Sequence, residues 1–517
     1  MRKLVLGLVL SGLLFAVACG GSGGGSSTSG TSNSAGENGG TSPAGNNSTS
    51  GINIAALIVD AGPPNLNHQG KAYIDSNIAF MTIKICAPGT ATCQTIDHVI
   101  VDTGSSGLRV PYQVFGQLNP ALLPNVNGSA LMAECIQFLD NSFFWGSVRY
   151  ADVYIGGPNN DGEVASSIPI HVMGDPALPA GSSIPASCSN VATSSGQVIT
   201  GTEEDTVAAV GGNGLLGLGV LQYDCDALVS GYYAAGSNGH NPCTCPSNPQ
   251  NVSCTDADFS LPPASYYTCS GGTCTSADLA IPLAQQVRNP VSMFATDNNG
   301  VILELPAVPI GGQADVLSGG SVIFGIGTQS NNALAGSATM LIVDTNPNNP
   351  DWTGFTTVFN GTSYPNATEE KTLRNKNSKT FTIGSFLDSG SNGIFFLDQP
   401  TSGVLDCTGG YADFYCPDTG QKPYYTQALS ADNIDVYGNS SQVQFNVSNT
   451  RDLSSSYTAF SDRAGPNTSG SSVTSVDEAA DGYFDWGLTF FYGKSVYTAI
   501  QGVVPPSGVQ PGPWWAY

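Results

Sequence analysis

The sequence predicts a mainly β fold. Beyond residue 52, short apolar runs rich in Val, Ile and Phe alternate with turns of Gly, Pro, Asn and Asp. Apolar runs bounded by turn residues are typical of strands. Helix-compatible stretches such as Ala280–Val287 are short, so we expect sandwich-like or barrel-like β lobes. The predicted strands are Ile78–Ile85, Thr95–Val101, Ser147–Ile155, Ser321–Ile326, Thr339–Val343 and Asn433–Val447.

The N-terminus predicts export. Arg2 and Lys3 precede an apolar run, and small residues follow it directly before Cys19. This order is typical of a signal peptide, here residues 1–18, and the run is too short for a comfortable membrane span. The Cys after the small residues resembles a bacterial lipobox, which implies that Cys19 is acylated. The alternative is an ordinary cleaved signal that leaves a free thiol.

A lipidated Cys19 would anchor the chain in a bacterial membrane, and we expect the outer membrane, facing the periplasm or the cell surface. Residues 19–52 are rich in Gly, Ser, Thr, Asn and Ala, which predicts a flexible tether. With 15 Lys and Arg against 39 Asp and Glu, the formal net charge is −24. This balance argues against nucleic-acid binding, which needs a basic surface.

The cysteines predict disulfides. Assigning Cys19 to lipid leaves an even number of the 13 Cys for pairing, as an exported protein requires. Six Cys lie between Cys225 and Cys274, in a loop-rich insert over residues 224–276, where the connectivity stays open. Outside the insert, the expected pairs are Cys86 with Cys93, Cys407 with Cys416, and Cys135 with Cys188.

Two similar motifs carry the candidate chemistry. Residues 99–111 read VIVDTGSSGLRVP and residues 386–396 read FLDSGSNGIFF. Each places an aspartate, Asp102 or Asp388, where an apolar strand opens into a Gly-containing turn. Burial opposes ionisation, and two facing carboxylates cannot both ionise, so such a pair shares one proton. The ionised member can then take a proton from water while the protonated member polarises a carbonyl.

These motifs resemble the two active-site motifs of the pepsin-like aspartic peptidases. Further segments are similar to that family in the same order: Asn213–Gly219, Ala280–Phe294, Gly319–Gly325 and Phe484–Ile500. The resemblance covers most of residues 75–500 and implies a bilobal β fold with the active site in a cleft between the lobes. It implies an N-terminal lobe over residues 53–327, including the Cys-rich insert, and a C-terminal lobe over residues 328–517.

The resemblance also implies residue roles. Asp102 and Asp388 take the catalytic positions, and Thr103 and Ser389 match paired hydroxyls that tie the two turns together. Ser105 and Ser391 match hydroxyls that hold the outer carboxylate oxygens. The Gly backbone amides of the two turns, at Gly104 and Gly390, would hydrogen-bond the same carboxylates.

The sequence departs from the family at two places. Arg109 stands where the family has a Trp, and we expect it to pair with a carboxylate such as Asp140 or to face solvent. The family's flap Tyr aligns with Phe138 or Leu139, so the flap is expected to be rebuilt, with Phe138 or Trp145 covering the cleft.

Two functions remain open from the sequence. The first is an aspartic endopeptidase that hydrolyses peptide or protein substrates with a water activated by Asp102 and Asp388. The alternative is a catalytically silent surface lipoprotein that binds a peptide, glycan or partner protein. The four His show no metal-ligand spacing, so we expect no metal and no cofactor. We also expect a monomer.

Overall fold

The computed structural model describes most of the chain beyond residue 50. The described residues are 51–64, 66, 76–138, 142–192, 198–224, 265–270, 272–276, 281–314, 317–343, 354–364, 384–467 and 483–517. The predicted signal peptide, Cys19, the tether up to residue 50, Leu139, Asp140 and most of the Cys-rich insert lie outside these ranges.

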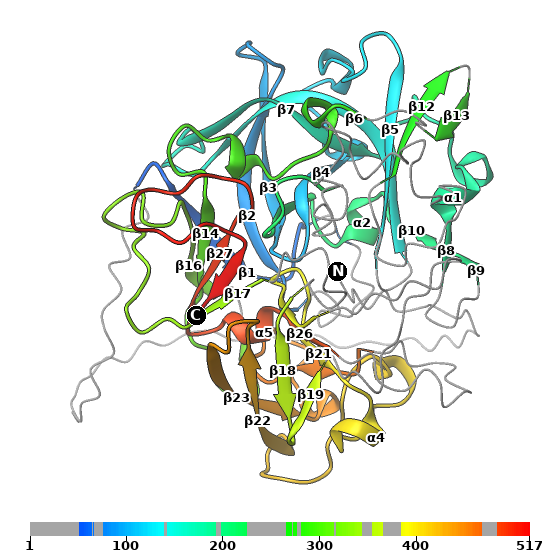
Figure 1. Ribbon diagram of the computed structural model, residues 1–517. Coiled ribbons are helices and arrows are strands. Elements are labelled where there is room, and N and C mark those ends of the chain that lie inside the picture. The colour runs from blue at the N-terminus through cyan, green and yellow to red at the C-terminus, as the bar shows by residue number, and fades with distance from the viewer. Residues whose placement is uncertain are drawn as a thin grey trace, which may run out of the picture.

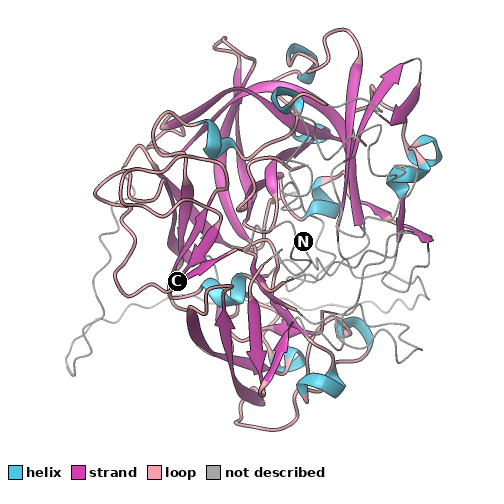
Figure 2. Ribbon diagram, viewed as in Figure 1, coloured by secondary structure: helices cyan, strands magenta, loops and turns pink. Residues whose placement is uncertain are grey.

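Strands dominate the described structure, as predicted (Figure 2). Within the described ranges the largest sheet contains 16 strands. They are β1 (Ile54–Val59), β2 (Ala79–Cys86), β3 (Cys93–Asp102), β4 (Ser106–Pro111), β5 (Leu131–Gln137), β6 (Ser142–Ile155), β7 (Glu163–Met173), β10 (Thr202–Glu203), β11 (Gly214–Leu218), β12 (Ser265–Ser270), β13 (Thr273–Ser276), β14 (Gly300–Glu304), β16 (Leu317–Phe324), β17 (Met340–Ile342), β27 (Ser495–Ala499) and β28 (Trp514–Ala516).

Six strands of this sheet close into a barrel. Their order is β2-β3-β11-β4-β7-β6, and β6 pairs back with β2 between Ile83–Cys86 and Asp152–Ile155. On the other side of β2 the sheet continues through β1, β16, β14, β27, β28 and β17. Strands from both ends of the chain therefore share one sheet (Figure 1).

Four smaller sheets complete the described strands. A four-stranded sheet has the order β19-β18-β22-β23, and a second has the order β20-β26-β21-β25. In Figure 1 these two lie together below the large sheet. Their strands are β18 (Thr356–Phe359), β19 (Thr362–Tyr364), β20 (Phe386–Leu387), β21 (Ile394–Phe396), β22 (Thr426–Ile434), β23 (Ser440–Ser448), β25 (Ala464–Gly465) and β26 (Phe484–Trp486). The two-stranded sheets are β8 (Asn190–Ala192) with β9 (Val198–Thr200), and β15 (Gln313–Ala314) with β24 (Tyr457–Ala459).

The α-helices among the described residues are single turns. They are α1 (Ala186–Ser189), α2 (Val207–Val210), α4 (Gln399–Ser402) and α5 (Leu488–Phe491). Thr206 caps α2 and Asp398 caps α4 through side-chain bonds to backbone amides, and a left-handed Gly follows each helix. No helix in the described part of the chain is long and apolar enough to span a membrane.

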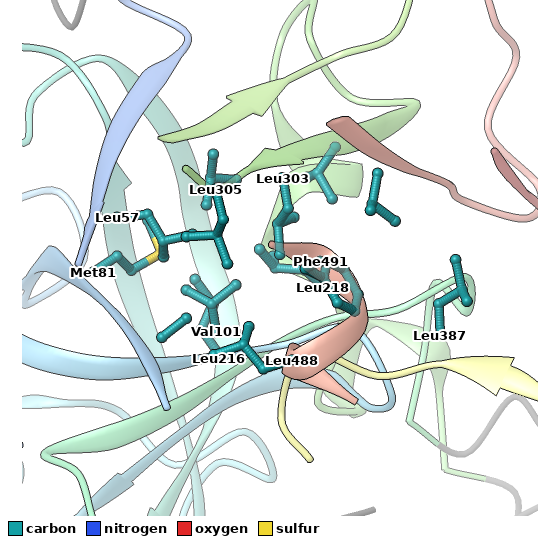
Figure 3. Packing of buried hydrophobic residues seen from close by; sticks show 14 of the residues in the cluster. Leu57, Met81, Val101, Leu216, Leu218, Leu303, Leu305, Leu387, Leu488 and Phe491 are labelled. Carbon is teal, nitrogen blue, oxygen red and sulfur yellow. The ribbon is translucent and has the colours of Figure 1, made fainter. Parts of the chain in front are cut away.

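One continuous apolar core joins the barrel to the sheets below it. Val101 of β3 and Leu216 of β11 belong to the same cluster of buried residues as Leu387 of β20 and Leu488 of α5. Figure 3 shows Val101 and Leu216 close to Leu488. Because interiors are close-packed, this core fixes the position of β3 relative to β20.

Two predicted elements differ from the structure. The run Asn433–Val447 is not one strand: β22 and β23 form a hairpin, and its turn falls inside the predicted range. Asp435 makes this turn by accepting hydrogen bonds from the amides of Tyr437 and Asn439. In the helix-compatible stretch Ala280–Val287, the described residues 281–287 contain a 3₁₀ turn, Leu283–Gln285, and no α-helix.

Four disulfides lie within the described ranges. Cys86–Cys93, Cys135–Cys188 and Cys407–Cys416 join the pairs expected from the sequence. Cys269–Cys274 lies inside the Cys-rich insert, where the sequence left the pairing open, and it staples the β12–β13 hairpin. Multiple disulfides are consistent with an exported protein.

Candidate active site

Asp102 lies where the buried strand β3 ends. Val99, Ile100 and Val101 are fully buried, because β3 lies between β2 and β11 in the barrel. β11 runs parallel to β3 and antiparallel to β4, the strand that leaves the Asp102 turn. The carboxylate is therefore held by a turn whose two flanking strands pair with the same third strand.

Asp388 has the same surroundings in a different sheet. It follows β20, and β26 runs parallel to β20 and antiparallel to β21, the strand that leaves the turn. β3, β4 and β11 thus correspond to β20, β21 and β26. In this correspondence Leu215 matches Asp485, since they pair with Ile100 and Phe386, each two residues before its aspartate.

The two turns are joined by reciprocal hydrogen bonds. The Thr103 amide donates to Ser389 Oγ at 3.1 Å, and the Ser389 amide donates to Thr103 Oγ1 at 2.9 Å. Each hydroxyl then donates to a carbonyl of the opposite motif, Thr103 Oγ1 to Leu387 at 3.0 Å and Ser389 Oγ to Val101 at 2.7 Å. The structure therefore brings together the two motifs that the sequence singled out.

Each carboxylate is held by its own turn in the same way. The Gly104 amide donates to Asp102 Oδ1 at 2.7 Å, and the Gly390 amide donates to Asp388 Oδ1 at 2.8 Å. Ser105 Oγ donates to Asp102 Oδ2, and Ser391 Oγ donates to Asp388 Oδ2 at 2.8 Å.

Both glycines also allow the carboxylates to approach each other. A Cβ at Gly104 would lie 2.6 Å from Asp388 Cγ, and one at Gly390 would lie 2.7 Å from Asp102 Oδ1. Any larger residue would therefore push the opposite carboxylate away. This close approach explains why both turns carry Gly at this position.

The two carboxylates titrate differently. Asp102 and Asp388 are 1% and 0% exposed, and a hydrogen bond joins their side chains. Burial, followed by the charge of Asp102, raises the pKa of Asp388 to about 7. Burial also opposes ionisation of Asp102, whereas hydrogen bonds from Asp388, Ser105 and Gly104 favour its ionised form, and the pKa of Asp102 lies below its ordinary value. At mildly acidic pH the pair therefore holds one proton, on Asp388, beside an ionised Asp102.

The candidate flap residues within the described ranges, Phe138 and Trp145, are packed in clusters of buried side chains. The Trp145 ring lies edge-on to Tyr267, its Nε1 donates to the Pro179 carbonyl, and it belongs to the buried cluster around Cys135 and Cys188. Phe138 is buried against Phe144, with ring centroids 4.6 Å apart. Leu139 lies outside the described residues. A role for these side chains over the dyad stays a prediction.

Arg109 corrects a sequence expectation. It does not face solvent, because its side chain is fully buried in β4. Its Nη2 contacts Glu134 Oε1 at 3.0 Å and Asp224 Oδ2 at 2.9 Å, and its Nη1 donates to the Ser106 carbonyl at 2.8 Å. Glu134 and Asp224 are therefore its carboxylate partners among the described residues, while Asp140 lies outside them.

A buried polar cluster surrounds Arg109. Tyr266 donates to Asp224 Oδ1 at 2.9 Å, and His171 Nδ1 lies 3.3 Å from Glu134 Oε2. Burial and the charge of Glu134 raise the pKa of Asp224 well above its usual value. Burial also opposes ionisation of Glu134, but the charges of Arg109 and His171 and hydrogen bonds from Asp224 and Arg109 together lower its pKa. Asp224 and Tyr266 both belong to the Cys-rich insert over residues 224–276, so the cluster attaches described residues of this insert to the barrel.

Sequence reasoning missed this cluster and one residue next to the dyad. The five members Arg109, Glu134, His171, Asp224 and Tyr266 come from separate segments, and strand register aligns Arg109 with His171 and Tyr266 with Glu134. Asp485 of β26 is the residue missed at the dyad, since its Oδ2 lies 2.6 Å from Ser391 Oγ. The sequence signal for Asp485 was a charged residue within the otherwise aromatic run of residues 483–486.

Within the described residues, no group of three or more His, Cys, Asp or Glu side chains could hold a metal ion.

Comparison with curated proteins finds no match to this chain. A protein family matches over residues 50–257 and 247–517, which together cover the whole chain beyond the predicted tether. The chain therefore belongs to the family described as "Protein of unknown function (DUF3443)".

Proposed function

We propose that this protein is an aspartic endopeptidase with a pepsin-like bilobal fold, in which Asp102 and Asp388 activate a water molecule. The observation that supports the proposal is the reciprocal hydrogen bonding of the two aspartate turns through Thr103 and Ser389. It gives two carboxylates in equivalent settings that share one proton, which is the arrangement that acid–base hydrolysis of an amide needs.

The proposed reaction follows from the two pKa directions. Ionised Asp102 takes a proton from water as the water oxygen attacks the peptide carbonyl carbon. Protonated Asp388 donates to the carbonyl oxygen, so the negative charge that develops there is neutralised. The resulting tetrahedral diol collapses when Asp102 passes its proton to the amide nitrogen, Asp388 takes a proton from one hydroxyl of the diol, and the C–N bond breaks. The dyad then returns to its state with one proton.

The second candidate is a catalytically silent protein that binds a peptide, glycan or partner protein. The specific observation in its favour is the burial of both carboxylates, since a substrate and a water must reach them for catalysis. The same hydrogen-bonded dyad would then stabilise the junction of the two motifs without reacting.

The proposal also includes export and lipid anchoring at Cys19, which would place the peptidase on a bacterial membrane with peptides or proteins as substrates. Replacing Cys19 with Ser is expected to abolish incorporation of a labelled fatty acid and to release the protein from the membrane fraction. Wild-type protein expressed in parallel provides the control. Continued labelling of the Ser variant would contradict this assignment.

The deciding experiment is digestion of a diverse peptide library from pH 3 to pH 8, analysed by mass spectrometry. Wild-type protein is compared with Asp102→Asn and Asp388→Asn, and the fold of each is checked by circular dichroism. The peptidase proposal expects cleavage by the wild type alone, because one carboxylate cannot serve as both base and acid. Absence of cleavage at every pH, or equal cleavage by the variants, would overturn it.

A further inference from the structure

The segment that follows β11, residues 219–222, lies directly against the Asp102 turn. The Gly219 amide donates to the Ser105 carbonyl at 2.8 Å. A Cβ at Gly219 would lie 2.7 Å from the Ser105 carbonyl oxygen and 2.9 Å from that of Thr103. The backbone of Gly219 therefore sets where the backbone of Ser105 lies.

Asn289 holds the other side of this segment. Its side chain is fully buried, its Nδ2 donates to the Gly219 carbonyl at 3.1 Å, and its backbone amide donates to the Gln222 carbonyl at 3.0 Å. Its Oδ1 accepts from the Val291 amide at 3.1 Å and so caps the 3₁₀ turn Pro290–Met293. Asn289 therefore ties Gly219 and Gln222 to a turn that its own side chain caps.

A chain of hydrogen bonds thus runs from Asn289 through Gly219 and Ser105 to Asp102. Its last member is the bond from Ser105 Oγ to Asp102 Oδ2. Burial opposes ionisation of Asp102, yet the pKa of Asp102 lies below its ordinary value, and the Ser105 hydroxyl is among the groups that favour the ionised form. The position of Ser105 therefore affects the charge state of the dyad.

The Asp388 half of the site holds its serine in a different way. Ser391 Oγ lies 2.8 Å from Asp388 Oδ2 and 2.6 Å from Asp485 Oδ2, so a side chain of β26 contacts the serine hydroxyl directly. Leu215 occupies the matching position in β11 and offers Ser105 no polar atom. The direction of the Ser105 hydroxyl therefore depends on its backbone position.

We propose that Asn289 is a positioning residue of the dyad: it holds Gly219, thereby fixes the backbone of Ser105, and keeps the Ser105 hydroxyl directed at the Asp102 carboxylate. The catalytic consequence rests on the proposed function. The coupling between Asn289 and the Ser105 hydroxyl can be measured without activity.

Charged groups adjoin this chain of hydrogen bonds. Asp388 lies across the dyad from Asp102, and Arg288 directly precedes Asn289 and donates to Ser292 Oγ at 2.8 Å. Replacing Asn289 with another neutral residue leaves these charges in place. Such a substitution therefore tests the hydrogen bonds of Asn289 rather than a change of charge.

The first test is a double-mutant cycle of Asn289→Ser and Ser105→Ala in denaturant unfolding at pH 7. Ser is a good cap residue and keeps an acceptor for the Val291 amide, but it lacks the amide that donates to Gly219. Ser105→Ala removes the hydroxyl and leaves the bond between the Ser105 carbonyl and Gly219. The increase in the unfolding constant caused by Asn289→Ser should be at least about twofold smaller in the Ser105→Ala background.

Asn332→Ser provides the matched control. Asn332 is also fully buried, its Nδ2 donates to the Phe324 carbonyl at 3.0 Å, and its Oδ1 accepts from the Gln329 amide at 2.8 Å. Its effect should be the same with and without the Ser105 hydroxyl. Additive effects of Asn289→Ser and Ser105→Ala would overturn the proposal, whether or not the protein cleaves peptides. Asn289→Thr, which also keeps a cap residue, repeats the cycle if the Ser variant does not fold.

The second test is the pH profile of kcat/KM for the wild type, Asn289→Ser and Asn332→Ser. Loss of the Asn289 donor should weaken the Ser105 contact with ionised Asp102, so the acid limb should move to higher pH. The alkaline limb, which reports Asp388, should stay in place, and Asn332→Ser should move neither limb. An unchanged acid limb, or an equal shift of both limbs, would contradict the proposal. If the wild type cleaves nothing, the peptidase function fails while the double-mutant cycle still decides the role of Asn289.

Discussion

Thr103 and Ser389 hold each other's turns: each backbone amide donates to the other's hydroxyl, at 2.9 Å and 3.1 Å. The two residues lie in turns that follow strands of different sheets, and each hydroxyl also donates to a carbonyl of the opposite motif. All four of these polar groups are buried, so the pair determines the relative position of the two aspartates.

Thr103→Val should therefore destabilise the protein strongly. The substitution keeps the shape of the side chain but leaves the Ser389 amide and the Leu387 carbonyl without this partner. A buried polar group without a partner costs about 1–3 kcal/mol, so we expect a loss of about 2–5 kcal/mol in denaturant unfolding. Thr103→Ser retains the hydroxyl and serves as the control. Equal stability of the Val and Ser variants would contradict the structural role.

Any peptidase activity should be confined to acidic pH. Catalysis needs Asp388 protonated, and its pKa of about 7 places the alkaline limb of the profile near neutrality. The acid limb reports protonation of Asp102, whose pKa lies below the ordinary carboxyl value, so activity should persist into distinctly acidic solution. The profile of kcat/KM for a peptide found in the library measures both limbs. A maximum above pH 8 would exclude this assignment of acid and base.

The dyad was predictable from sequence because its chemistry is local. Asp102 and the residues that hold its carboxylate, Gly104 and Ser105, lie within four positions of one another, and the motif repeats at Asp388. Asp485 and Glu134 were not predictable, because they reach their partners only through strand pairing across distant segments. A shift of one residue in register would turn either side chain to the opposite face of its strand.

The burial of Arg109 was likewise not predictable from the sequence, and it leads to a third prediction. Arg109→Met should destabilise the protein by about 3–5 kcal/mol, because it leaves the ionised Glu134 buried without its cation. Adding Glu134→Gln to Arg109→Met should recover much of this loss. Arg451→Met provides the control, since Arg451 bonds to Thr408 at the surface and should change little. Strictly additive effects of the Arg109 and Glu134 substitutions would contradict a direct ion pair.

His171 should set a lower pH limit for the folded protein. Its ring is fully buried, and burial, with the charge of Arg109 adding to it, lowers the pKa from 6.5 to about 4 despite the nearby Glu134. The unfolded chain therefore binds a proton more readily than the folded one between these values. Stability is lost as pH falls through this window, by roughly 3 kcal/mol when the lower pKa has been passed.

The substitution His171→Gln removes this titration and isolates its effect. Denaturant unfolding of the wild type and the Gln variant from pH 7 to pH 4 should give a stability difference that shifts steadily in favour of the variant as pH falls. His98 supplies the control, because contacts with Asp60 raise its pKa, so His98→Gln should shift the difference in the opposite direction. A His171→Gln difference that does not change with pH would show that the buried imidazole titrates normally. In that case His171 would not set the lower pH limit for the folded protein.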